Sequence, residues 1–167
     1  MASRVYLRHP TLKDEREFLR LVKASRALHR PWVAPPRDPK QYRQHLAKIR
    51  ERTHCGFLVC RATDDAIAGV INVTHMILGP LRSAFVGYYA FAGFERLGLM
   101  REGLNTVVRH AFNSLKLHRL EANIQPGNTA SVALAMSCGF SKEGYSPRYL
   151  KIGGRWRDHE RWAIVAS

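Results

Sequence analysis

Two helix starts carry residue types whose spacing could do chemistry. Gly98 closes a loop that leads into a helical pattern beginning at Leu99. Such a helix start presents free backbone N–H groups and the positive end of the helix dipole, which together bind phosphate without basic side chains. Asn128 is suited to cap another expected helix, and Ser131 lies one turn inward at the same end. A plain strand-to-helix connection also often contains one glycine, and Asn128 could be only a cap, so the first start is a candidate phosphate site and the second a candidate polar site.

Other chemically active side chains form no recognisable constellation. Asp158 and His159 are adjacent, but they fall in the expected late hairpin and are interpreted as a structural or wall pair. The histidines lack metal-ligand spacing, so no metal site is predicted. The cysteines are odd in number and also lack metal-type spacing, so reduced thiols are expected. The residues concerned are His9, His29, His45, His54, His75, His110, His118 and His159, with Cys55, Cys60 and Cys138.

The elements that must position these residues alternate between strand and helix patterns. Strands are expected over 4–8, 56–62, 67–76, 83–91, 118–124, 145–152 and 156–165. Helices are expected over 12–26, 39–52, 99–116 and 129–137. Gly153-Gly154 is a suitable hairpin turn between the last two strands. No repeat or linker divides the chain, so we predict one α+β domain over 1–167, with a central sheet flanked by about four helices.

Composition excludes several classes of protein. Hydrophobic residues make up 46% of the 167 residues and charged residues 24%, which is a globular balance rather than a disordered one. No stretch approaches the roughly 20 apolar residues of a membrane helix, and the N-terminus lacks an apolar secretory core. With the reduced thiols, these features predict a cytoplasmic protein without a membrane partner.

The charge is strongly basic and unevenly distributed. Lys and Arg number 27 against 13 Asp and Glu, which gives a net charge of +14. Residues 1–52 alone carry 14 basic and 5 acidic side chains. Such a surface attracts a ribosome, a nucleic acid or a phosphate-bearing cofactor through a field that salt screens. An arginine-rich background composition would give the same numbers, so charge alone does not choose a partner.

Residues 121–145 resemble the second half of the GNAT N-acetyltransferase domain. In that family an Asn, a small residue three positions later and a Gly-Phe pair recur, and Asn128, Ser131, Gly139 and Phe140 have this spacing. The loop 95–100 falls where the family binds pyrophosphate. The tail at 149–159 resembles the RimJ/RimL group, the ribosomal-protein-alanine N-acetyltransferases and their relatives. The resemblance covers essentially the whole chain and is looser over 1–80.

The resemblance implies a GNAT fold with acetyl-CoA as donor and a primary amine as acceptor. The mostly antiparallel mixed sheet would split into a V, and the pantetheine arm would lie in it against the strand end at 89–91. One backbone N–H there would stabilise the oxyanion as the amine attacks. The implied cofactor-binding residues are Tyr89, Ala90, Phe91, Glu95, Arg96, Leu97, Gly98, Leu99, Met100, Arg101, Asn128 and Ser131.

The proton carriers depart from the family pattern. Many relatives place a Tyr, which protonates the leaving thiolate, where this chain has Ala135. A Ser at the position of Ser131 can do this in the RimJ/RimL group, so Ser131 is the expected catalytic residue. The group often carries a carboxylate base where this chain has Arg148. The replacement bases considered are Glu102, Glu95 and His75.

The pyrophosphate loop also departs from the family pattern. Glu95 stands where relatives carry Gln or Arg, and Leu97 stands where many carry a basic residue. A carboxylate beside a pyrophosphate is unfavourable unless it turns away. Arg96 and Arg101 could compensate for both changes electrostatically.

The acceptor remains open at the level of sequence. Trp32 and the loop 29–37 are the best candidates for the acceptor groove, because the family shapes this site between its first two helices. The leading acceptor is the N-terminal α-amino group of a ribosomal protein, with docking through the basic residues of 1–52. Two alternatives are a small-molecule amine and a CoA-binding ribosome- or RNA-associated module without turnover. A monomer and a dimer are equally compatible with the sequence.

Overall fold

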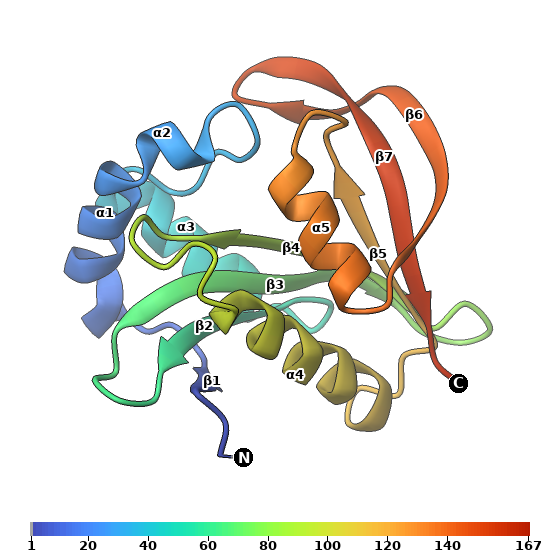
Figure 1. The fold of residues 1–167 in the computed structure, drawn as a ribbon, viewed down its shortest axis with the longest axis horizontal. Helices are drawn as coiled ribbons and strands as arrows, with labels where there is room; N and C mark the ends of the chain where they lie inside the picture. The colour runs from blue at the N-terminus through green and yellow to red at the C-terminus, as the bar shows by residue number, and fades with distance from the viewer. Residues whose placement is uncertain (1) are drawn as a thin grey trace.

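One seven-stranded mixed sheet organises residues 2–167, the part of the chain that the computed structural model describes (Figure 1). The strand order is β1-β2-β3-β4-β5-β7-β6, and of these neighbours only β4 and β5 run parallel. The strands are β1 (Val5–Arg8), β2 (Cys55–Arg61), β3 (Ile67–Ile77), β4 (Ser83–Ala90), β5 (Arg119–Ile124), β6 (Ser141–Ile152) and β7 (Arg155–Val165).

The expected helix over 12–26 is three pieces, so the structure has five α-helices rather than about four. Thr11 caps a short 3₁₀ turn at Leu12–Asp14, and α1 and α2 are separated at Ser25, whose backbone is not helical. The Ser25 hydroxyl accepts a hydrogen bond from the Ala92 N–H at 2.9 Å, which explains why the chain bends there. The α-helices are α1 (Glu15–Ala24), α2 (Arg26–His29), α3 (Pro39–Ile49), α4 (Leu99–Asn113) and α5 (Thr129–Ser137).

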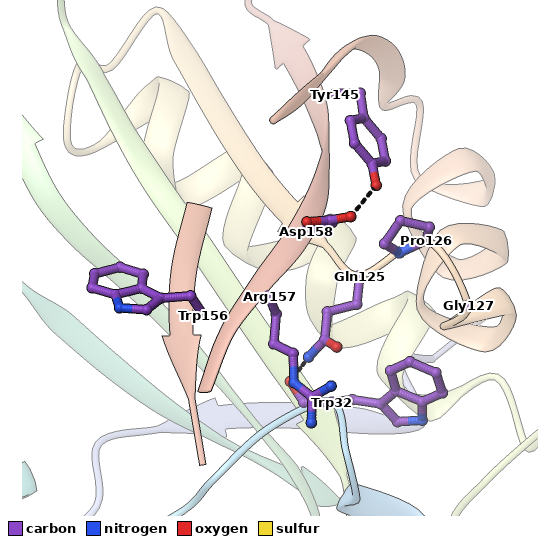
Figure 2. A pocket seen from close by; sticks show the side chains of 8 residues that line it. All are labelled: Trp32, Gln125, Pro126, Gly127, Tyr145, Trp156, Arg157 and Asp158. Carbon is purple, nitrogen blue, oxygen red and sulfur yellow. Dashed lines mark hydrogen bonds between the residues drawn. The ribbon is translucent and has the colours of Figure 1, made fainter. Parts of the chain in front are cut away.

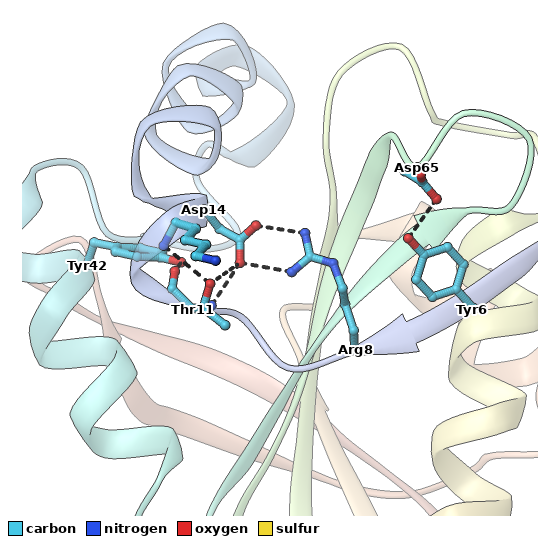
Figure 3. Close-up of polar contacts among 7 residues, drawn as sticks. Tyr6, Arg8, Thr11, Asp14, Tyr42 and Asp65 are labelled. Atoms are coloured by element: carbon cyan, nitrogen blue, oxygen red, sulfur yellow. Dashed lines mark hydrogen bonds and ion pairs between the residues drawn. The ribbon is translucent and has the colours of Figure 1, made fainter.

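A polar network fixes the first helices to the edge of the sheet (Figure 3). Arg8 of β1 donates to both carboxylate oxygens of Asp14, at 2.9 and 2.7 Å. The Thr11 N–H donates to the same carboxylate, and Tyr42 of α3 donates its hydroxyl proton to the Thr11 carbonyl at 2.8 Å. Asp14 is buried, and a buried carboxylate is stable only with such partners.

Both faces of the sheet are covered, because alternate residues of the central strands enter different cores. In β2, Val59 packs in the core beneath α4, whereas Leu58 and Cys60 pack in the core formed with α1 and α3. In β3, Ile71 packs in the core beneath α4, and Val70 packs in the core formed with α1 and α3. The two cores hold the sheet between helix layers, with α4 and α5 on one face (Figure 1).

The sheet opens between β4 and β5. These strands pair only over Ser83–Phe85 and Arg119–Glu121. Beyond that point β4 continues along β3 and β5 continues along β7, so Val86–Ala90 and Ala122–Ile124 diverge. The expected V is therefore present, with α5 lying across it in Figure 1.

The last hairpin is longer and less regular than expected. β6 begins at Ser141 instead of 145, and its register with β7 shifts twice, between Lys142 and Gly144 and between Ser146 and Leu150. Irregular pairing of this kind breaks the alternation by which strands are recognised in a sequence. The Gly153-Gly154 turn is confirmed, with both residues at positive φ.

Candidate active site

The loop before α4 ends at Gly98, which leaves the N–H groups at the start of the helix accessible. Gly98 has φ of 77°, a left-handed conformation that favours glycine, and a Cβ there would lie 2.9 Å from the Arg4 guanidinium. The first N–H groups of α4 have no intrahelical partner by helix geometry. Of the residues predicted here, Leu99 and Met100 are buried in the core, whereas the side chains of Arg96, Leu97 and Arg101 are exposed.

Both carboxylates near this helix start turn toward other partners. Glu95 accepts a hydrogen bond from the Gly93 N–H at 2.6 Å, which holds the loop on itself. Glu102 pairs with the Arg4 guanidinium at 2.5 Å and also accepts from the Arg4 N–H. Arg4 additionally donates to the Leu97 carbonyl at 3.0 Å. The helix start is thus left without a competing negative charge aimed at it.

At the end of β4, beside the opening, some backbone hydrogen-bonding groups already have partners within the protein. The Phe91 N–H donates to the Ala68 carbonyl at 2.9 Å, and the Ala90 carbonyl lies 2.7 Å from Nε2 of His29. His29 is buried, and burial lowers its pKa. The rings of Tyr89, His29 and Phe91 pack against one another, with centroids 5.1 to 6.0 Å apart. These contacts fix the end of β4 against α2.

The start of α5 is joined to β4 by Tyr88, a residue that the sequence analysis did not single out. Asn128 caps α5 by accepting from the Ser131 N–H at 3.3 Å. Tyr88 of β4 donates its hydroxyl proton to the Ser131 carbonyl at 2.8 Å, and burial raises the pKa of Tyr88 to about 12. The Ser131 hydroxyl itself has no hydrogen-bond partner among residues 2–167, so its proton is not committed elsewhere.

A cavity of about 470 Å³ lies between the loop after α2, the loop before α5 and the β6–β7 hairpin (Figure 2). Buried Gln125 holds that first loop by donating to the carbonyls of Pro31 and Trp32 at 3.0 and 3.2 Å. Trp32 lies against Gly127, where a Cβ would approach its ring to 3.1 Å. The lining residues are Trp32, Gln125, Pro126, Gly127, Tyr145, Trp156, Arg157 and Asp158.

The cavity wall holds one carboxylate, Asp158. Tyr145 donates its hydroxyl proton to Asp158 at 2.5 Å, and the Arg148 N–H donates to the other oxygen at 2.8 Å. The tyrosine hydrogen bond, followed by the backbone one, lowers the pKa of Asp158. His159 is instead buried, with Nδ1 2.9 Å from the Arg157 carbonyl. The adjacent pair thus divides into one wall residue and one structural residue.

None of the three replacement bases lines this cavity. Glu102 is bound to Arg4 and Glu95 to the Gly93 N–H, as described above. His75 lies in the irregular stretch of β3 between Thr74 and Ile77, with its ring 4.9 Å from that of His54. All three side chains contact residues outside the cavity lining, and the identity of the general base stays a prediction.

Metal and membrane features were also searched over residues 2–167. No group of three or more His, Cys, Asp or Glu side chains is placed to hold a metal ion in this part of the chain. None of the helices described is long and apolar enough to cross a membrane. The three cysteines are free thiols.

The structure combines a sheet that opens between β4 and β5, a helix start with free amides and a polar cavity, which suits an enzyme that binds two substrates. The family described as the acetyltransferase (GNAT) domain matches residues 4–141, so the chain belongs to the GNAT acetyltransferase family. It has the GNAT fold and is an N-acetyltransferase that uses acetyl-CoA. The α4 start fits that donor, because its amides are free and both neighbouring carboxylates turn elsewhere.

Relatives agree on the reaction and differ in the acceptor that their names state. The [ribosomal protein uS5]-alanine N-acetyltransferase of Escherichia coli is 33% identical over 145 residues, covering 81% of this chain and 74% of the relative. A spermidine N(1)-acetyltransferase of Vibrio cholerae is 31% identical, covering 100% and 96%. The structure of Mycobacterium smegmatis RimJ in complex with CoA-disulfide has a TM-score of 0.88 at 28% identity, covering 97% and 82%.

Proposed function

We propose that this N-acetyltransferase acetylates the N-terminal α-amino group of a polypeptide, with a ribosomal protein as the leading candidate. The observation that carries the proposal is the cavity beside Trp32, whose only lining carboxylate is Asp158. A single carboxylate with a lowered pKa binds one ammonium group. The cavity is open enough for the amine to arrive on an extended chain, and pockets of this volume accept ligands larger than an amine alone.

The residues predicted for the donor take distinct parts in this proposal. The free amides at the start of α4, beyond Gly98, would bind the pyrophosphate, with the Arg96 and Arg101 side chains nearby. The diverging strand edge at Tyr89–Phe91 would align the pantetheine arm. Asn128 would hold the start of α5 beside it through its cap of Ser131.

The chemistry then needs positioning and two proton transfers. Asp158 would hold the ammonium group, and the amine would lose its proton to solvent water, because the lowered pKa of Asp158 makes its carboxylate a poor proton acceptor. The neutral amine forms the new C–N bond at the thioester carbonyl, the nitrogen then loses one proton to water, and the C–S bond breaks. Ser131 would donate its hydroxyl proton to the departing thiolate and recover a proton from solvent.

A polyamine acceptor is the main alternative, and the charge of this chain opposes it. The net charge of +14 repels a polycation during encounter. Of the fourteen basic residues in 1–52, nine form no ion pair with a carboxylate of residues 2–167. These nine would support docking on a ribosome. They are Lys13, Arg16, Lys23, Arg26, Arg30, Arg37, Lys40, Arg50 and Arg52.

The test combines acetyl-CoA titration calorimetry with an assay of free CoA release. The acceptor panel contains N-terminal peptides, spermidine and the same peptides blocked at the N-terminus but carrying a lysine. We expect acetyl-CoA binding, and release of CoA with free N-termini at a KM within the usual range of roughly 1 μM to 1 mM. Release with spermidine or with the blocked lysine peptide, and none with free N-termini, would refute the proposal. Binding without turnover on any amine would favour the CoA-binding module.

A further inference from the structure

One arginine in the cavity wall lacks the partner that its burial requires. Arg157 precedes Asp158 on β7 and lines the same cavity, and in Figure 2 the two side chains point to different parts of it. Nε of Arg157 is buried and has no hydrogen-bond partner among residues 2–167. Asp158, in contrast, already accepts from Tyr145 and from the Arg148 N–H. A buried donor without an acceptor is costly, so this position is suited to a ligand that supplies one.

Three further arginines lie close in the sequence to residues of the cavity wall. Arg30 is two residues from Trp32 in the sequence, Arg155 is next to Trp156, and the Arg148 backbone is bonded to Asp158. All three side chains are exposed, and none of them is within ion-pair distance of a carboxylate in the described part of the chain. Arg157 is the arginine of the described lining and Asp158 its carboxylate, and positions close to the lining in the sequence add three more unpaired arginines, which favours an acceptor that carries more negative than positive charge.

We propose that the acceptor is a polypeptide N-terminus followed within its first few residues by acidic side chains, and that Arg157 binds the first of these carboxylates. This inference rests on the proposed function. The amine would lie at Asp158, and a carboxylate carried by the second or third residue would reach about 7–10 Å further along an extended chain. The guanidinium of Arg157 binds a carboxylate by two parallel hydrogen bonds, which an amide or a lysine ammonium cannot offer. Arg157 is thus a specificity-determining residue, and Arg30, Arg148 and Arg155 attract the acidic segment.

The first experiment compares three ten-residue peptides that share the first residue, alanine, and carry Glu, Gln or Lys at the next three positions. We expect kcat/KM for the Glu peptide to exceed that for the Gln peptide by about 10- to 100-fold at low salt, and the Lys peptide to be slowest. The ratio should shrink as salt is raised. Equal values for the Glu and Gln peptides would overturn the inference while leaving the proposed function intact. Turnover of spermidine and of no peptide would instead overturn the proposed function.

The second experiment assigns the preference to Arg157. In Arg157→Gln we expect the ratio of kcat/KM for the Glu and Gln peptides to fall to within a few-fold of one. In Arg157→Lys we expect only part of this preference to be kept. The matched control is the double variant Arg109→Gln with Lys116→Gln, which removes two exposed charges at and beyond the C-terminal part of α4, outside the cavity lining and outside 1–52, and should keep the ratio. Acetyl-CoA titration checks that each variant is folded.

Three outcomes would overturn the inference. One is a preference that falls equally in the Arg109/Lys116 control, since it would then belong to net charge. Another is free glutamate acetylated faster than any peptide, which would indicate an amino acid acceptor. The third is tight binding of a homopolymeric RNA that is lost in Arg157→Gln while the peptides are not discriminated, which would assign the arginines to a nucleic acid.

Discussion

At the scale of single residues, the proposed acid, Ser131, and the proposed ammonium-binding residue, Asp158, differ in the hydrogen bonds that their side chains already make. The Ser131 hydroxyl has no partner in the described part of the chain, whereas the Asp158 carboxylate has two. A free hydroxyl can reorient toward a leaving group, and a fixed carboxylate can orient an ammonium group. The assignment of the acid to Ser131 remains a prediction that mutation can test.

Replacement of Ser131 by Ala should lower kcat by about 100-fold, the lower end of the usual contribution of proton transfer. Binding of acetyl-CoA should be retained, because the Asn128 cap uses the Ser131 N–H and the Tyr88 hydrogen bond uses its carbonyl. Steady-state kinetics and calorimetry measure the two effects separately. Ser137→Ala is the matched control on the same helix. A kcat within about twofold of the wild type would exclude Ser131 as the acid.

Residues whose role is decided by their neighbours in the sequence could be predicted, whereas residues whose role depends on contacts between strands could not. Asn128 was predicted to begin a helix because capping is decided within a few residues, and it does cap α5. Asp158 was interpreted only as part of a structural or wall pair, because its partner Tyr145 lies on the opposite strand of an irregular hairpin. The carboxylate expected at position 148 is absent, yet the Arg148 N–H bonds to the carboxylate that lines the cavity.

At the scale of elements, the cavity depends on how closely the loop after α2 approaches the loop before α5. Gln125 supplies the polar contact and Gly127 the space in which Trp32 lies. Because Gly127 has no positive φ, its role is close approach rather than backbone conformation. A small change at this point should therefore move the acceptor side alone.

In Gly127→Ala the new Cβ would be 3.1 Å from the Trp32 ring, so the ring must shift by a few tenths of an ångström. We expect KM for the amine to rise roughly 3- to 10-fold, since displacement of a positioning group weakens productive binding. KM for acetyl-CoA should not change, and it serves as the internal control within the same data set. An equal rise in both values would mean that the loop shapes the donor site as well.

The fold itself was largely predictable, because each strand and helix carries its own periodic signal. The exceptions arise where a distant contact overrides the local pattern. Helix periodicity continues through Ser25, but the chain bends there to reach Ala92. Glu102 looked available as a base, yet Arg4 binds it from 98 positions away in the sequence. No local pattern predicts such a contact.

At the scale of the whole molecule, buried histidines make folding sensitive to acid. His29 and His54 are buried and His45 is half-buried, and burial lowers the pKa of all three below the usual 6.5. Each has one ring nitrogen without a partner among residues 2–167. Protonation of His29 or His45 would place a charge without a carboxylate partner in the interior, which the unfolded chain avoids, whereas Nδ1 of His54 lies 3.8 Å from the Glu51 carboxylate.

The free energy of unfolding should therefore be constant above about pH 7 and should decrease as the pH falls below 6.5. In that window the unfolded chain binds protons that the native chain does not, so acid favours unfolding. Each such histidine contributes a slope of at most about 1.4 kcal/mol per pH unit. Urea unfolding at pH 7.5, 6.5 and 5.5 measures the slope. His29→Gln, which keeps a donor for the Ala90 carbonyl, should reduce it, while His118→Gln at an exposed position should not. A stability that rises on acidification would show that these rings are charged in the native protein.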